Sequence, residues 1–176
     1  MNMNKNSIYP NTETIEYERG YFGIGIENVK STKNLGTVWR SAQIMGADFM
    51  FVIGERYEHM KTDTMKTWKH IPLFYFKTIE QFLESLPKDS QLIGIELDER
   101  STPIINFSHP ERAVYLLGAE DKGLSEIALK NCHTVIQLPG TFSLNVSAAA
   151  SIVLYDRCVK NRYCSIGNKT LSLEIN

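Results

Sequence analysis

Residues 138–150 are the most informative stretch of this chain, and they read Leu-Pro-Gly-Thr-Phe-Ser-Leu-Asn-Val-Ser-Ala-Ala-Ala. A bend at Pro139 and Gly140 is followed by Ser143, Asn145 and Ser147, and then by alanines. A turn that opens a helix presents free backbone N–H groups, and short polar side chains add donors at the same place. The segment therefore predicts a ligand-binding turn at the start of a helix. Capping and close helix packing are the purely structural alternative.

Two earlier segments, 34–40 and 116–125, read Asn-Leu-Gly-Thr-Val-Trp-Arg and Leu-Leu-Gly-Ala-Glu-Asp-Lys-Gly-Leu-Ser. Taken alone, each has an ordinary explanation. Arg40 could pair with a carboxylate or cover apolar surface with its stem. Glu120 could favour the start of the helix that follows it.

Apolar runs alternate along the chain with stretches of helical pattern. Strands are expected at 22–26, 49–53, 71–76, 92–97, 113–117 and 134–138, and helices at 35–45, 79–86, 126–131 and 145–162. This alternation predicts an α/β fold with a mostly parallel sheet flanked by helices. Ligands bind beyond the carboxyl ends of the strands in such sheets, and the three polar segments all begin at or follow an expected strand end. We therefore expect the segments to meet at one edge.

The length of 176 residues, with 43% hydrophobic content, suits one domain. Residues 1–19 are polar and without periodicity, and they predict a flexible leader. The expected domain covers 20–165, followed by a tail at 166–176. Gly23 and Gly25 could begin a dinucleotide-binding fingerprint, but its third glycine is missing. They are therefore interpreted as strand residues.

Charge and cysteine content narrow the possible partners. Lys plus Arg number 19 against 20 Asp plus Glu, so any RNA contact must come from a local patch. Residues 56–70 are the candidate patch, with basic side chains beside Tyr57 and Trp68, and a solvated loop is the equal alternative.

Three cysteines without metal-ligand spacing predict reduced thiols and no metal site. No apolar run approaches a membrane span, so a cytoplasmic protein is expected.

In this order, the segments 34–40, 116–125 and 138–150 resemble the signature blocks of the SpoU (TrmH-like) branch of the SPOUT RNA methyltransferases. The resemblance covers most of the chain. It implies a C-terminal deep trefoil knot, S-adenosylmethionine as cofactor and a homodimer. It also implies methyl transfer to the 2′-hydroxyl of an RNA ribose, with tRNA favoured and rRNA as the alternative. A noncatalytic RNA-binding relative of the same fold is the hypothesis from another class of protein.

The resemblance also assigns roles to particular residues. By resemblance Arg40 would activate the hydroxyl. Because a guanidinium is a poor base, we interpret Arg40 instead as a phosphate clamp that also steadies the developing alkoxide. The other catalytic residues would orient Arg40, the ribose or the cofactor; they are Asn34, Glu120, Ser143 and Asn145. The residues implied to bind the cofactor are Glu96, Leu117, Gly118, Leu138, Ser143, Leu144 and Asn145.

Two further features follow from the resemblance. Only three residues separate Pro139 from Ser143, a loop shorter than in many family members. The helix face with Ile152, Val153 and Tyr155 would pack against a partner subunit. Its alternative is ordinary core within one chain.

Overall fold

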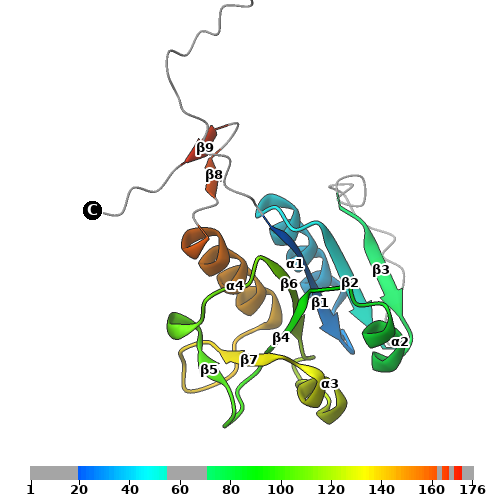
Figure 1. Ribbon diagram of the computed structural model, residues 1–176. Coiled ribbons are helices and arrows are strands. Elements are labelled where there is room, and N and C mark those ends of the chain that lie inside the picture. Colours follow the sequence, from blue (N-terminus) through cyan, green and yellow to red (C-terminus); the bar gives the residue numbers. More distant parts are fainter. Residues whose placement is uncertain (1–19, 55–70, 162–163, 167–168, 172–176) are drawn as a thin grey trace, which may run out of the picture.

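A computed structural model describes residues 20–54, 71–161, 164–166 and 169–171. The expected leader at 1–19 and the candidate basic patch at 56–70 lie outside the described residues. Among the described residues, seven strands form one sheet in the order β3-β2-β1-β6-β4-β7-β5, and every neighbouring pair is parallel (Figure 1). The strands are β1 (Tyr21–Glu27), β2 (Phe49–Ile53), β3 (Leu73–Phe76), β4 (Gln91–Ile95), β5 (Thr102–Pro103), β6 (Arg112–Leu117) and β7 (Thr134–Gln137).

Two pairs of helices cover the two faces of the sheet. Helices α1 (Thr32–Ile44) and α4 (Val146–Lys160) pack on one face, and α2 (Ile79–Glu84) and α3 (Glu126–Asn131) pack on the other (Figure 1). The hydroxyls of Ser41 and Ser151 lie 2.9 Å apart and join α1 to α4. Each helix begins at a polar cap, since Ser31, Thr78, Ser125 and Asn145 accept bonds from the backbone of the first turn.

The central strands are apolar on both sides because both faces of the sheet are covered. Along β6, Ala113, Tyr115 and Leu117 face α1 and α4, whereas Val114 and Leu116 face α2 and α3. In β1, side chains at Gly23 and Gly25 would collide with the rings of Phe49 and Phe51. The interpretation of these glycines as strand residues is confirmed.

The expected α/β class is confirmed, and every expected strand and helix is present within a few residues of its expected bounds. Helix α4 ends at Lys160, two residues before the expected end. Sequence analysis missed β5, the 3-10 helix η2 (Ile104–Asn106) and an antiparallel hairpin of β8 (Cys164–Ile166) and β9 (Lys169–Leu171). The expected domain boundary at 165 falls within β8. The trefoil knot stays a prediction.

A buried polar cluster anchors the carboxyl end of α4. Arg157 donates to the carbonyls of Pro110 and Glu111, at 2.6 and 2.9 Å, and to the hydroxyl of Tyr115 at 3.2 Å. That hydroxyl lies 2.6 Å from Nδ1 of His109, whose Nε2 lies 2.8 Å from Asp156. Since Tyr115 accepts from Arg157, its own proton is directed to Nδ1, and Nε2–H donates to Asp156. The cluster fixes the far end of the helix whose beginning forms the candidate site.

The stability of the protein should depend on the protonation of His109. Burial lowers the pKa of His109 below its usual value of 6.5, and the nearby charges of Arg157 and Lys160 act in the same direction, while the bond to Asp156 opposes them. Unfolded chains then bind more protons than folded ones below about pH 6.5, so the free energy of unfolding falls as the pH drops towards the folded-state pKa. Urea unfolding between neutral pH and about pH 5 should show this slope.

Two variants separate titration of His109 from its packing. His109→Gln should flatten the slope, because the titrating group is gone. Tyr115→Phe should lower stability by about 1–3 kcal/mol, because it leaves a buried N–H of Arg157 unpaired, and should still show a slope of the same sign, because His109 stays buried. An unchanged slope in His109→Gln would show that another group controls the pH dependence.

Candidate functional site

A pocket opens at the carboxyl ends of β4, β6 and β7. It encloses about 650 Å³, including its open mouth, and the three loops that follow these strands line it together with the start of α4. The lining residues are Ile95, Glu96, Leu97, Leu117, Gly118, Ala119, Glu120, Gly123, Leu138, Pro139, Phe142, Ser143, Leu144, Val146 and Ala149. This is the edge at which parallel α/β sheets bind ligands.

Side chains from the three polar segments meet at the rim of this pocket. The amide nitrogens of Asn34 and Asn145 both donate to Oε1 of Glu120, at 2.6 and 2.7 Å. The same nitrogen of Asn145 lies 3.4 Å from Oδ1 of Asn34. We call Asn34, Glu120 and Asn145 the rim cluster. The expectation that the three segments converge is confirmed.

The rim cluster is held rigidly by the start of α4. Oδ1 of Asn145 caps the helix by accepting from the backbone and the hydroxyl of Ser147, at 2.9 and 2.6 Å. Both ends of the Asn145 amide are therefore engaged. Glu120 does not cap α3, because Ser125 performs that role.

Two carboxylates hold the turn that carries Glu120. Glu96 accepts from the backbone of Leu124 at 2.9 Å and of Leu97 at 3.1 Å. Glu27, which is 3% exposed at the end of β1, accepts from the backbone of Ser125 at 2.9 Å. Sequence analysis missed Glu27, although a lone carboxylate ending an apolar strand is a signal that could have identified it.

The turn also requires glycine at position 123. Gly123 has φ +65°, and a side chain there would place its Cβ 2.6 Å from Oε2 of Glu96. Gly123→Ala should therefore lower the free energy of unfolding by about 2 kcal/mol, from left-handed backbone strain and displacement of Glu96. Chemical denaturation measures the effect, and Lys122→Ala is the neighbouring control. Equal stability of the two variants would contradict this account of the turn.

The structure brings most of the expected cofactor-binding residues together. Six of them line the pocket, namely Glu96, Leu117, Gly118, Leu138, Ser143 and Leu144, whereas Asn145 belongs to the rim cluster. Sequence analysis did not assign Ala119, Gly123, Val146 or Ala149 to the site, since their inclusion depends on the folded course of the loops. Binding of a cofactor by these residues stays a prediction.

Arg40 lies apart from the rim cluster. It is exposed on α1 and is absent from the residues that line the pocket. Arg40 follows Asn34 by six positions in α1, so its side chain projects about 240° around the helix axis from that of Asn34. Among the described residues it makes no hydrogen bond or ion pair, so Glu120 holds Asn34 and Asn145 rather than Arg40.

The expected partner-binding face of α4 divides into two parts. Val153 is fully buried in the core of the chain, whereas Ile152 and Tyr155 are exposed. Ile44 on the adjacent helix α1 is also exposed. Val153 therefore belongs to the core, and the remaining side chains stay available to a partner subunit.

No group of three or more His, Cys, Asp or Glu side chains in residues 20–54, 71–161, 164–166 and 169–171 is placed to hold a metal ion. Within the same ranges, none of the helices has the length and apolar character that crossing a membrane requires. Cys132 is a free thiol, and the sulfur of Cys158 lies 3.7 Å from the carbonyl oxygen of Met45.

The fold and the site define a parallel α/β protein with a ligand pocket at the carboxyl edge of its sheet. The model of the SpoU rRNA Methylase family matches residues 22–155. The chain belongs to this family.

The chain is similar to an uncharacterized tRNA/rRNA methyltransferase of Archaeoglobus fulgidus, with 29% identity over 147 residues, 77% of this chain and 63% of that protein. It is 27% identical to the 23S rRNA (guanosine-2′-O-)-methyltransferase RlmB of Acinetobacter baylyi, over 77% of this chain and 58% of RlmB. The chain thus spans about three fifths of the length of these two relatives.

Solved structures share the fold at low sequence identity. The SpoU methyltransferase AviRb from Streptomyces viridochromogenes has a TM-score of 0.71 at 20% identity, covering 80% of this chain and 60% of AviRb. The AdoMet-bound rRNA methyltransferase from Sinorhizobium meliloti has a TM-score of 0.73 at 22% identity, covering 80% and 57%. A protein studied for 2-OH methylation of C/U34 on tRNA has a TM-score of 0.71 at 20% identity, covering 81% and 97%.

Proposed function

We propose that this chain uses S-adenosylmethionine to methylate the 2′-hydroxyl of a ribose in RNA. The observation that carries the proposal is the rim cluster, in which Glu120 joins Asn34 to Asn145 beside a pocket built from the family's segments. Membership of the SpoU family and the 2′-O activity in the name of RlmB support the same reaction.

The residues of the pocket fit S-adenosylmethionine. Leu117, Leu138 and Ala149 offer apolar walls suited to an adenine ring. Glu96 and Glu120 supply carboxylates that complement a positively charged sulfonium. The cofactor would supply an electrophilic methyl group for displacement by an oxygen nucleophile.

The chain's own residues would then position the RNA. The rim cluster uses one oxygen of Glu120 for both amides, and the second oxygen makes no hydrogen bond among the described residues, so it can accept from a ribose hydroxyl. Arg40, exposed on α1, would clamp a backbone phosphate. Ser143 in the pocket wall would contact the substrate or the cofactor.

We further propose tRNA as the substrate, a homodimer as the active form and a cytoplasmic location. The protein studied for tRNA C/U34 methylation matches this chain over 97% of its own length. Exposed Ile44, Ile152 and Tyr155 on neighbouring helices support a second copy as partner. Methylation of rRNA is the alternative.

The experiment that tests the function combines binding with transfer. Calorimetry with S-adenosylmethionine should show saturable binding, and labelled methyl should then appear in bulk tRNA. Arg40→Ala serves as the control for enzymatic transfer. Cofactor binding without transfer to tRNA or rRNA would favour a noncatalytic RNA-binding protein.

A further inference from the structure

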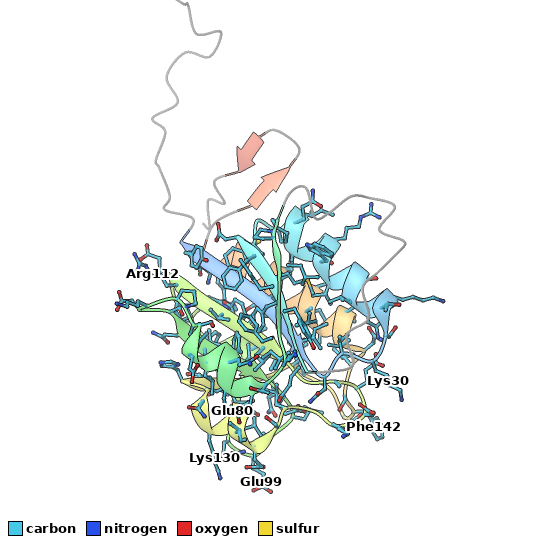
Figure 2. The ribbon with its side chains drawn as sticks, turned by 90° about the vertical axis from the view of Figure 1, so that its right-hand side faces the viewer. Lys30, Glu80, Glu99, Arg112, Lys130 and Phe142 are labelled. Carbon is cyan, nitrogen blue, oxygen red and sulfur yellow. The ribbon has the colours of Figure 1, made fainter. Side chains whose placement is uncertain are left out.

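Phe142 has an unusual position for a large apolar side chain. It is 84% exposed, the highest exposure among the large hydrophobic side chains that the structure describes. It also contributes to the lining of the pocket, in the short loop between Pro139 and the start of α4. Figure 2 shows it at the lower right of the molecule, with Arg112 on the left.

We propose that Phe142 is a stacking platform for a base of the RNA substrate next to the target ribose. This inference rests on the proposed function and adds a specificity-determining residue to it. A flat aromatic side chain at the mouth of a pocket suits an unstacked base, because every base offers a face for stacking. With 84% of its surface exposed, the ring is free to stack on a base at the mouth of the pocket.

The neighbouring side chains extend this platform. Leu97 and Leu144, which are 43% and 44% exposed, belong to the same pocket lining as Phe142. Together with Phe142 they form an apolar surface at the mouth of the pocket. Such a surface can contact one face and the edge of a base that is not stacked on its neighbours in the RNA.

A cation at the same end of the molecule suits the charge of an RNA backbone. Lys30 lines a smaller hollow with Asn34, and this hollow shares Ala119, Glu120 and Val146 with the main pocket. Its side chain is 66% exposed and lies 3.9 Å from Asp121, a loose pairing that leaves the ammonium accessible. Figure 2 places Lys30 and Phe142 at the same end. The rim cluster thus has a cation and an aromatic ring near it, a combination that matches single-stranded nucleic acid.

The test measures RNA and cofactor separately in full-length variants. Phe142→Ala should raise the KM for bulk tRNA by about tenfold or more, since base stacking on an aromatic side chain is lost. Phe142→Leu should behave like the alanine variant, and Phe142→Trp should stay close to wild type. All three should bind S-adenosylmethionine within about twofold of wild type, because the ring lies at the mouth. Phe74→Ala, which removes a half-exposed ring from β3, is the matched control and should leave both values unchanged.

The outcomes separate this inference from the proposed function. If wild type methylates RNA and Phe142→Ala does so with an unchanged KM, the stacking platform is wrong and the function stands. If Phe142→Ala weakens cofactor binding as much as it raises the KM for RNA, the ring contacts the cofactor and the inference is also wrong. If wild type transfers no methyl group to any RNA, both proposals fail.

Discussion

Replacing Glu120 with Ala is expected to lower kcat/KM for methyl transfer by about 100-fold. A hydrogen bond to a charged group contributes about 1.5–3 kcal/mol, and Glu120 accepts two of them, from Asn34 and Asn145. The cluster is exposed, so we take the lower end of that range. Glu120→Gln should lose only about tenfold, because its carbonyl oxygen still accepts both amides with weaker bonds. Single-turnover methyl transfer with saturating cofactor measures both effects.

The control for Glu120 is Glu84, another exposed carboxylate, in the helix α2 on the opposite face of the sheet. Glu84→Ala on α2 removes the same charge and should retain the activity of wild type. Thermal unfolding of all three variants shows whether any loss reflects unfolding. Full activity of a folded Glu120→Ala protein would exclude the rim cluster from the reaction.

Arg40→Ala is expected to reduce methyl transfer by about 10- to 100-fold, because a hydrogen bond to a charged group such as a phosphate contributes about 1.5–3 kcal/mol. Arg40 is exposed and makes no hydrogen bond or ion pair among the described residues, so its loss should leave the melting temperature unchanged. It lies outside the pocket, so S-adenosylmethionine should bind with unchanged affinity. Arg40→Lys should recover little activity, because an ammonium cannot form the paired bonds of a guanidinium.

Lys33 provides the matched control for Arg40. It is exposed on the same side of α1, two turns earlier, and carries the same charge. Lys33→Ala should cost only a few-fold in the KM for RNA, as expected for one phosphate contact. If Lys33→Ala and Arg40→Ala lose the same activity, Arg40 contributes only nonspecific electrostatic attraction of RNA.

The regular elements of the fold could be predicted from the sequence because both faces of the sheet are covered. Strands such as β2 and β6 are then continuous apolar runs, and their ends are visible as a change to polar residues. The strand β5 has two residues, one of them Pro103, and η2 has three. Elements of that length carry no periodicity, so nothing in the sequence indicates them.

A residue of the site could be predicted where a single segment of the sequence supplies both the residue and its structural neighbours. Asn145 at the start of α4 and Gly118 after β6 are of this kind. Glu27 is marked in the sequence by its place at the end of an apolar strand, but its bond to the backbone of Ser125 was not predictable, because the two residues are far apart in sequence. The angle between Arg40 and Asn34 around α1 follows from their spacing, whereas the bond of Asn34 to Glu120 depends on how α1 packs against the sheet, which the motif does not contain.

In the proposed function, the pocket and the rim cluster present a methyl donor to a ribose hydroxyl. The most direct test incubates the full-length protein with tRNA and methyl-labelled S-adenosylmethionine, and then identifies the labelled nucleosides by mass spectrometry. The account predicts label in a 2′-O-methylated nucleoside, lost in Arg40→Ala and Glu120→Ala. Label on a base instead of the ribose, or no label in any RNA although the cofactor binds, would contradict it.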